Sequence, residues 1–416
     1  MPSQLDNQQQ PISILFTHYG NEWIRGSERC LLDLITHIDR KKFNPIVWCN
    51  CKVMADAARK LNVTTYHTDF PLLFGWHKPR FHFSAFFSLI NFGKYLIEEH
   101  NVKMIHANSG APNQWLNMVS RAMKVPLVAH LHSCYPLRDR LTLGLHQVAM
   151  TVGVSQPVIN QLLDDGLPQQ RTCVIPNGID INRLEQQTKT DLRHLLSFDE
   201  NDFVIATVGS LIHRKGTDLI IEAIARLIAL GIPARLVIIG DGPERLQLQK
   251  QIQWLDIQRN IILMGERTDV SALLKGADLY VSAAREEVFG LVLAEASLAG
   301  LAVVAPSLGG IPDVVIKGKT GKLFAAEDIG ALTKAMHMFY HSPELRNEMG
   351  AAGRQHVINN FSIKRNTRDF ERLYTRMLYE PEMHMRWNSH WQVLHPLVNA
   401  TRQVLGKSFK GLIHGH

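Results

Sequence analysis

Residues 282–300 read SAAREEVFGLVLAEASLAG, and this stretch predicts a strand that gives way to a helix. The apolar run Ala277–Ser282 has the composition of a buried strand, whereas the residues after Gly290 favour a helix. The first N–H groups of such a helix have no intrahelical partner and lie at the positive end of the helix dipole, so they suit a phosphate. We therefore expect an anion site at Gly290, where the missing side chain lets a ligand come close.

Two glutamates, Glu287 and Glu295, bracket the small apolar run Phe289–Val292. If the helix is counted from Glu287, Glu295 lies about 80° around it and points to one side rather than directly below Glu287. A carboxylate there is unsuited to a phosphate but can accept hydrogen bonds from two sugar hydroxyls. The alternative is an ordinary amphipathic helix with two solvated glutamates.

Short apolar runs alternate with helical patterns twice along the chain. The strands expected in the first half are Ile12–Phe16, Pro45–Cys49, Val63–Tyr66, Met104–Ala107, Leu127–Leu131, Met150–Val154 and Thr172–Ile175. Those expected in the second half are Phe203–Val208, Arg235–Ile239, Ile261–Met264, Leu279–Ser282, Ala302–Ala305 and Lys322–Phe324. This alternation predicts an α/β protein with two facing Rossmann-like, doubly wound parallel-sheet domains and a ligand cleft between them.

Length and composition agree with two globular domains. The chain has 416 residues, a length that exceeds what one hydrophobic core usually supports. With 45% hydrophobic and 20% charged residues, its composition is that of a globular protein. We expect a first domain over residues 1–183, a second over 184–362, and helices with a basic tail over 363–416; the turn-rich join begins at Pro176. We expect neither a transmembrane helix nor a signal peptide, and we expect the five cysteines to be reduced thiols.

A second anion site is expected where the second half begins. The strand Phe203–Val208 ends at Gly209, and a loop with Arg214 and Lys215 leads into a helix that opens at Gly216. An Arg fork and a Lys point charge can together neutralise a diphosphate. The alternative is a solvated basic loop.

These motifs resemble those of the family 4 retaining glycosyltransferases of GT-B fold, the glycosyl transferases group 1. The resemblance implies that Glu287 contacts the donor sugar, Glu295 the nucleotide ribose and Lys215 the diphosphate. The family commonly has an Arg directly after the first glycine of the basic loop, where this chain has Ser210. Arg214 as a substitute for that missing cation is our inference.

Other parts of the second half match the same family. The string Val174–Asp180, VIPNGID, is similar to its hinge motif, and Ser307–Asp313 resembles a glycine loop near the donor, with Asp313 in place of the usual Glu. Ile239–Pro243 looks like a strand-end glycine turn, and Gly265–Arg267 lies where the backbone usually meets the nucleobase.

The first half corresponds to the acceptor side of the family. Gly26–Arg29 reads Gly-Ser-Glu-Arg in place of the more usual Gly-Gly-Ala-Glu, and His132 matches a strand-end histidine near the transferred sugar. His18, His106 and His130 are weaker candidates, and their spacing is not that of a metal site.

The resemblance implies transfer of a sugar from a nucleotide-sugar donor with retention of configuration, the leaving diphosphate itself taking the acceptor proton. The expected catalytic residues are His132, Lys215 and Glu287. The expected donor-binding residues are Gly26, Gly209, Arg214, Lys215, Arg267, Glu287, Phe289, Gly290, Leu291, Val292 and Glu295. We expect no cofactor and no metal, because basic side chains and a helix dipole can replace a divalent cation. A nucleotide-sugar 2-epimerase of the same fold, or a catalytically silent nucleotide-sugar-binding protein, is the alternative function.

Two further segments bear on the acceptor. The C-terminal tail repeats apolar residues from Trp387 to Leu405 at helical spacing and has no acidic residue after Glu382, which suits an anionic bilayer or packing on the first domain. The aromatic stretch Phe70–Tyr95 suits a lipid-linked acceptor or a core. We expect a cytoplasmic enzyme, peripheral on the inner face of the membrane, that acts on a glycan or lipid-linked acceptor and binds no nucleic acid. The sugar, the nucleobase and the acceptor are not specified by these patterns.

Overall fold

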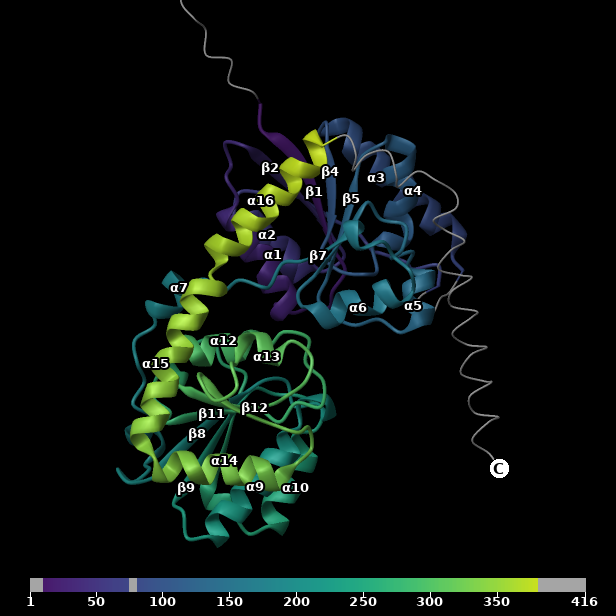
Figure 1. Cartoon of the computed structure of the whole chain (residues 1–416). Coiled ribbons are helices and arrows are strands. Elements are labelled where there is room, and N and C mark those ends of the chain that lie inside the picture. Colours follow the sequence, from purple (N-terminus) through teal and green to yellow (C-terminus); the bar gives the residue numbers. More distant parts are fainter. Residues whose placement is uncertain (1–9, 75–80, 381–416) are drawn as a thin grey trace, which may run out of the picture. The chain divides into compact units, whose positions relative to one another are not determined.

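The computed structural model describes residues 10–74 and 81–380, which divide into two compact units (Figure 1). The first takes the described residues up to Pro176 and those from Asn366 onward, and the second takes Asn177–Arg365. The sequence placed these boundaries at 183/184 and 362/363. The second crossing falls inside one continuous helix, α16 (Ile363–Tyr379), so no break in composition marks it.

The first unit is built on a seven-stranded parallel sheet with the order β3-β2-β1-β4-β5-β6-β7. Its strands are β1 (Ile12–His18), β2 (Phe43–Cys49), β3 (Thr64–His67), β4 (Met104–Ala107), β5 (Leu127–Leu131), β6 (Met150–Gly153) and β7 (Thr172–Val174). Its helices are α1 (Gly26–His37), α2 (Lys52–Lys60), α3 (Phe83–Glu99), α4 (Asn113–Met123), α5 (Leu137–Thr142) and α6 (Gln156–Asp164), with a 3-10 turn at Gln169–Arg171.

The last helix, α16, completes the core of the first unit. Its residues Phe370 and Tyr374 are fully buried and pack with Ile14 and Phe16 of β1. The hydroxyl of Tyr374 lies 2.7 Å from Nδ1 of His106 in β4. A segment more than 250 residues away in the chain thus closes one face of this sheet.

The second unit has a six-stranded parallel sheet with the order β10-β9-β8-β11-β12-β13. Its strands are β8 (Phe203–Val208), β9 (Ala234–Ile239), β10 (Ile261–Gly265), β11 (Leu279–Val281), β12 (Ala302–Pro306) and β13 (Gly321–Phe324). Its helices are α7 (Ile181–Glu185), α8 (Leu192–Leu196), α9 (Thr217–Ala229), α10 (Arg245–Trp254), α11 (Val270–Leu274), α12 (Leu291–Leu298), α13 (Ile311–Val314), α14 (Ile329–His341) and α15 (Pro343–Asn360), with 3-10 turns at His213–Lys215 and Gln258–Asn260.

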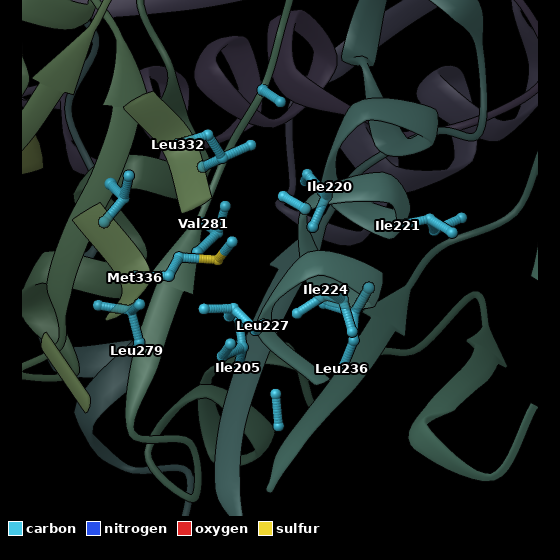
Figure 2. Close-up of a cluster of buried hydrophobic side chains, with 14 of the residues drawn as sticks. Ile205, Ile220, Ile221, Ile224, Leu227, Leu236, Leu279, Val281, Leu332 and Met336 are labelled. Carbon is cyan, nitrogen blue, oxygen red and sulfur yellow. The ribbon is translucent and has the colours of Figure 1, made fainter. Parts of the chain in front are cut away.

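Helices cover both faces of this sheet because successive strand residues point to opposite sides. Ile205 of β8 faces the cluster formed with α9 and α14, which Figure 2 shows around Ile224 and Met336. Its neighbour Val204 faces a smaller cluster with Leu192 of α8 and residues of α11.

The structure confirms the predicted strands of both halves and their parallel arrangement. The strand ends differ by two residues at most, as is usual for element boundaries. Within residues 10–74 and 81–380, every helix is too short or too polar to cross a bilayer. The predicted amphipathic tail from Trp387 to Leu405 lies outside the described residues.

Candidate functional site

Each sheet reverses its strand order beside its first strand, between β1 and β4 in one unit and between β8 and β11 in the other. Open parallel sheets bind ligands beyond the carboxyl ends of the strands at such a switch point. In the second unit, the loop after β8 carries Lys215 and the loop after β11 carries Glu287. The two motifs chosen from the sequence therefore meet where the topology places a ligand.

Lys215 and Glu287 form an ion pair with 2.6 Å between Nζ and Oε2. Their side chains are 25% and 14% exposed, so ligands can reach the pair. Carbons of the Lys215 side chain lie 3.8 Å from the position that a Cβ on Gly209 would take. Burial raises the pKa of Glu287, but the charge and hydrogen bond of Lys215 outweigh it, and the pKa lies below its ordinary value. Glu287 is therefore a carboxylate at neutral pH.

Arg285 holds the two loops together, a role that the sequence interpretation missed. Its guanidinium donates to both carboxylate oxygens of Asp218 at 2.8 and 2.7 Å, and to Glu327 at 2.8 Å. Its backbone N–H donates to the carbonyl of Arg214 at 2.8 Å. Arg214 in turn donates from Nη1 to the carbonyl of Glu286 at 3.0 Å. The sequence feature that could have indicated this role is the position of Arg285, directly before Glu286 and Glu287.

The predicted change from strand to helix occurs at Gly290, the N-cap residue of α12. Gly290 has φ +90°, a left-handed conformation that favours glycine. Glu287 therefore lies outside α12, which begins at Leu291. The predicted 80° angle between Glu287 and Glu295 was wrong, because it assumed that both residues lie on one helix. Glu295 lies in the second turn of α12 and is half-buried.

The residues on either side of Gly290 differ in how far their side chains are exposed to a ligand. The side chain of Phe289 is 2% exposed and packs edge-on against Phe361 at 5.5 Å. This leaves only the backbone of Phe289 for the predicted ligand contact. Leu291 and Val292 are half-buried in the first turn of α12.

A glycine loop after β12 packs on the same site. Gly309 has φ +54°, and a Cβ there would lie 1.7 Å from the carbonyl oxygen of Glu287. The N–H of Gly310 donates to that oxygen at 3.3 Å. Arg267, by contrast, is exposed after β10, and its guanidinium binds Asp269 at 2.7 and 2.9 Å. Its predicted contact with the donor would have to compete with that pair.

In the first unit, the polar residues gather at the switch point between β1 and β4. His18 ends β1, Asn108 follows β4 and His132 follows β5. Nε2 of His132 lies 3.1 Å from Oδ1 of Asn108. Gly26 begins α1. The predicted His132 thus has a partner, Asn108, that the sequence interpretation did not single out.

His106 and His130 are buried beneath this group, and their rings lie 5.3 Å apart. Burial lowers the pKa of His106 to about 3, and it also lowers the pKa of His130 well below the ordinary value. Neither nitrogen of His130 has a hydrogen-bond partner in the described part of the chain. The side chains of His106 and His130 are therefore both neutral at physiological pH. Across residues 10–74 and 81–380, no group of histidine, cysteine and acidic side chains has the arrangement of a metal site.

Comparisons with known proteins cover both units. A family model described as "Glycosyltransferase Family 4" matches residues 24–183, and one described as "Glycosyl transferases group 1" matches residues 188–356. Together they span most of the chain.

Two curated relatives and one solved structure illustrate the similarity. The N-acetyl-alpha-D-glucosaminyl L-malate synthase of Bacillus anthracis is 24% identical over 68% of this chain and 76% of its own. A GDP-mannose-dependent monoacylated alpha-(1-6)-phosphatidylinositol monomannoside mannosyltransferase of Corynebacterium glutamicum is 32% identical over 44% of this chain and 50% of its own. The structure of Anabaena HepE in complex with UDP-glucose has a TM-score of 0.74 and 21% identity, and the match covers 88% of this chain and 99% of that one.

Proposed function

The chain belongs to the glycosyl transferases group 1 family, and from this premise we propose that it transfers a sugar from a nucleotide-sugar donor to a glycan or lipid-linked acceptor with retention of configuration. It is a glycosyltransferase of GT-B fold. The observation that carries the proposal is the Lys215–Glu287 pair at the switch point of the second sheet, in the loops that lead into α9 and α12.

The donor diphosphate has a set of positive groups to bind. The N–H groups at the start of α12, the ammonium of Lys215 and the guanidinium of Arg214 supply charge without a metal ion. A bound diphosphate competes with Glu287 for Lys215, which frees the Glu287 carboxylate to accept hydrogen bonds from sugar hydroxyls. Glu295, further along α12, accepts the ribose hydroxyls.

The proposed reaction proceeds on one face of the sugar. The bond between the anomeric carbon and the diphosphate oxygen breaks, the acceptor oxygen bonds to that carbon from the same side, and its proton passes to the departing diphosphate. Lys215, Arg214 and the helix start stabilise the charge that develops on the leaving group, which is electrostatic catalysis. We also propose that His132, which follows β5, contacts the transferred sugar.

Exposed aromatic residues support a lipid-linked acceptor. Because β3 ends at His67 and β4 begins at Met104, α3 starts at the carboxyl edge of the first sheet, the edge that carries His132. Phe81, Phe83 and Phe87, at its start, are 54%, 57% and 54% exposed. Such a patch marks an interaction surface on a soluble domain. The rest of the stretch is divided: Phe70 and Phe86 are buried, and Trp76, Lys78 and Arg80 lie outside the described residues.

This surface motivates a proposal of reversible attachment to an anionic membrane in cell-surface polysaccharide or glycolipid synthesis. The test is co-sedimentation with anionic liposomes at low and high salt. We compare the full chain, a chain ending at Glu380, and full-length Phe83→Ser/Phe87→Ser. Loss of binding in the shortened chain assigns attachment to the tail, and loss in the double variant assigns it to α3. Equal sedimentation of all three would contradict both assignments. If none of them sediments, a soluble acceptor is favoured, in line with the malate in the name of the Bacillus relative.

The catalytic proposal is tested by titrating a panel of nucleotide sugars, beginning with UDP- and GDP-sugars, and by transfer assays with the donors that bind. The anomeric configuration of the product, read by NMR, decides retention. Formation of an epimer from donor alone would instead establish the 2-epimerase. Binding without hydrolysis, transfer or epimerisation would establish a silent binding protein.

A further inference from the structure

A continuous chain of hydrogen bonds runs from His132 into the interior of the first unit. His132 Nε2 lies 3.1 Å from Oδ1 of Asn108, whose Nδ2 lies 3.1 Å from Nδ1 of His18. His18 Nε2 then lies 3.0 Å from Oε1 of Glu28 in α1. Asn108, His18 and Glu28 are 0%, 1% and 4% exposed, so water does not compete for these bonds.

The direction of every bond follows from one carbonyl group. Nδ2 of Asn108 lies 3.0 Å from the backbone oxygen of Ser27, which can only accept a hydrogen bond. This contact fixes the amide, because a reversed Asn108 would place two oxygens against each other. Oδ1 therefore faces His132 and accepts a hydrogen bond from its Nε2–H.

The other end of the chain agrees with this direction. The second hydrogen on Nδ2 of Asn108 is donated to Nδ1 of His18, which must be unprotonated. His18 then carries its proton on Nε2 and donates it to the carboxylate of Glu28. Burial raises the pKa of Glu28, but the hydrogen bonds from His18 and from the backbone of Arg25 lower it below its ordinary value, so Glu28 is ionised.

The neighbours of His132 keep it neutral. Burial and then the repulsion from His130 and His18, opposed by Glu28, lower the pKa of His132 well below its ordinary value. A Cβ on Gly20 would lie 2.7 Å from Nε2 of His18 and 2.8 Å from Oε1 of Glu28, so the backbone at Gly20 covers that pair closely. No residue in the described part of the chain hydrogen-bonds to Nδ1 of His132.

We infer that Asn108, His18 and Glu28 are positioning residues that hold His132 as the Nε2–H tautomer and leave its Nδ1 as a hydrogen-bond acceptor for a hydroxyl of the sugar. The contact with sugar rests on the proposed function, whereas the tautomer does not. The wrong tautomer would turn Nδ1 into a donor and lose the preferred acceptor geometry.

The tautomer is tested by NMR of protein labelled with ¹⁵N-histidine, near neutral pH, with His132→Gln to assign the signals. We expect Nε2 of His132 to be protonated and Nδ1 to be unprotonated. Asn108→Ala should shift both nitrogens toward a mixture of tautomers. Glu28→Gln keeps one acceptor oxygen for His18 but loses the acceptor for the backbone N–H of Arg25, so it should shift the His132 signals less than Asn108→Ala does. Asn44→Ala, which removes an exposed amide elsewhere in the unit, should leave them unchanged.

A protonated Nδ1 in the wild type, or unaltered His132 signals in folded Asn108→Ala, would overturn the inference. If Asn108→Ala does not fold, the less disruptive Asn108→Ser provides the same comparison. The NMR result stands even if the wild type binds no nucleotide sugar, an outcome that would refute only the proposed function.

Kinetics then test the contact with sugar. Asn108→Ala should lower kcat about tenfold, the effect of weakening one hydrogen bond to the sugar, with the Kd of the nucleoside diphosphate unchanged. Glu28→Gln should lower kcat less than Asn108→Ala does, because the remaining amide oxygen can still accept from Nε2 of His18. An unchanged kcat in Asn108→Ala with altered NMR signals would remove the Nδ1 contact from the mechanism.

Discussion

At the scale of single residues, the ion pair between Glu287 and Lys215 determines the position of both side chains and the charge of Glu287. The ion pair keeps Glu287 ionised in a half-buried position and holds the Lys215 ammonium at the end of β8. In the proposed function, a diphosphate enters this site by replacing Glu287 as the partner of Lys215. This exchange makes the consequences of removing each charge different.

Glu295 is expected to contribute to affinity. Glu295→Ala should weaken nucleoside diphosphate binding by about 1–3 kcal/mol, because hydrogen bonds from ribose to a carboxylate are lost. Isothermal titration calorimetry measures this loss, with Glu286→Ala, an exposed acid before the same helix, as the matched control. Unchanged affinity in folded Glu295→Ala would exclude the ribose contact.

Lys215 is expected to contribute mainly to turnover. Lys215→Ala should lower kcat by about 100-fold or more, the usual effect of removing a group that stabilises developing charge. The free energy of unfolding should fall by only about 1 kcal/mol, since the pair is partly exposed. Lys250→Ala, an exposed change on α10, serves as control in both the transfer assay and urea unfolding. Near-normal turnover would assign the role to Arg214 or another cation.

At the scale of elements, Arg285 joins the loop after β11 to the start of α9. Arg285→Ala should lower the free energy of unfolding by about 1–3 kcal/mol, because its bidentate bond to Asp218 is lost. Burial raises the pKa of Asp218, but Arg285 lowers it below the ordinary 3.8. The contribution is therefore present above pH 3.8 and disappears as the pH falls through the lower folded-state pKa.

Urea unfolding at a series of pH values measures this effect. The difference between wild type and Arg285→Ala should be full at neutral pH and narrow in acid. Arg226→Ala removes an exposed i,i+4 pair with Glu222 and should cost about 0.5 kcal/mol or less. An equal loss in the two variants would mean that Arg285 adds no more than a surface ion pair.

The glycine loop after β12 is expected to set the position of Glu287. Gly309→Ala combines a left-handed backbone with a collision against the carbonyl of Glu287, whereas Gly318 has φ +77° and nothing within 4 Å of an added Cβ. Both variants should lose about 1–2 kcal/mol of stability from backbone strain, and Gly309→Ala should lose more because of the collision. Only Gly309→Ala should also weaken donor binding, by roughly tenfold or more, a loss of about 1.4 kcal/mol. Equal donor affinities by calorimetry would show that the loop does not control the site.

At the scale of the whole molecule, the charge of the diphosphate must be neutralised by the protein or by a metal ion. We expect EDTA to leave transfer largely intact, because Lys215, Arg214 and the start of α12 supply the positive charge. The measurement compares initial rates with and without EDTA, followed by added Mg²⁺ or Mn²⁺. Complete loss of activity that a metal ion restores would contradict this prediction.

The sequence determined where the strands and helices of this protein lie and which motifs form its candidate site. Each buried strand is a short apolar run bounded by turn residues, and such local patterns need no knowledge of neighbouring strands. The helix starts at Gly216 and Gly290 followed from a glycine placed between a predicted strand and a helical pattern. Local pattern could not reveal that Phe289 turns its side chain into the core.

Only the tertiary structure decided which residues meet. Lys215 and Glu287 are 72 positions apart, and His18 and Asn108 are 90 apart. They come together because β8 pairs with β11 and β1 with β4. Parallel neighbours are joined through long crossovers, so their pairing leaves no periodic signal in the sequence. The same reason hid Arg285 and the chain from His132 to Glu28. The return of α16 to the first unit is a contact between segments far apart in the sequence, which no local pattern reveals.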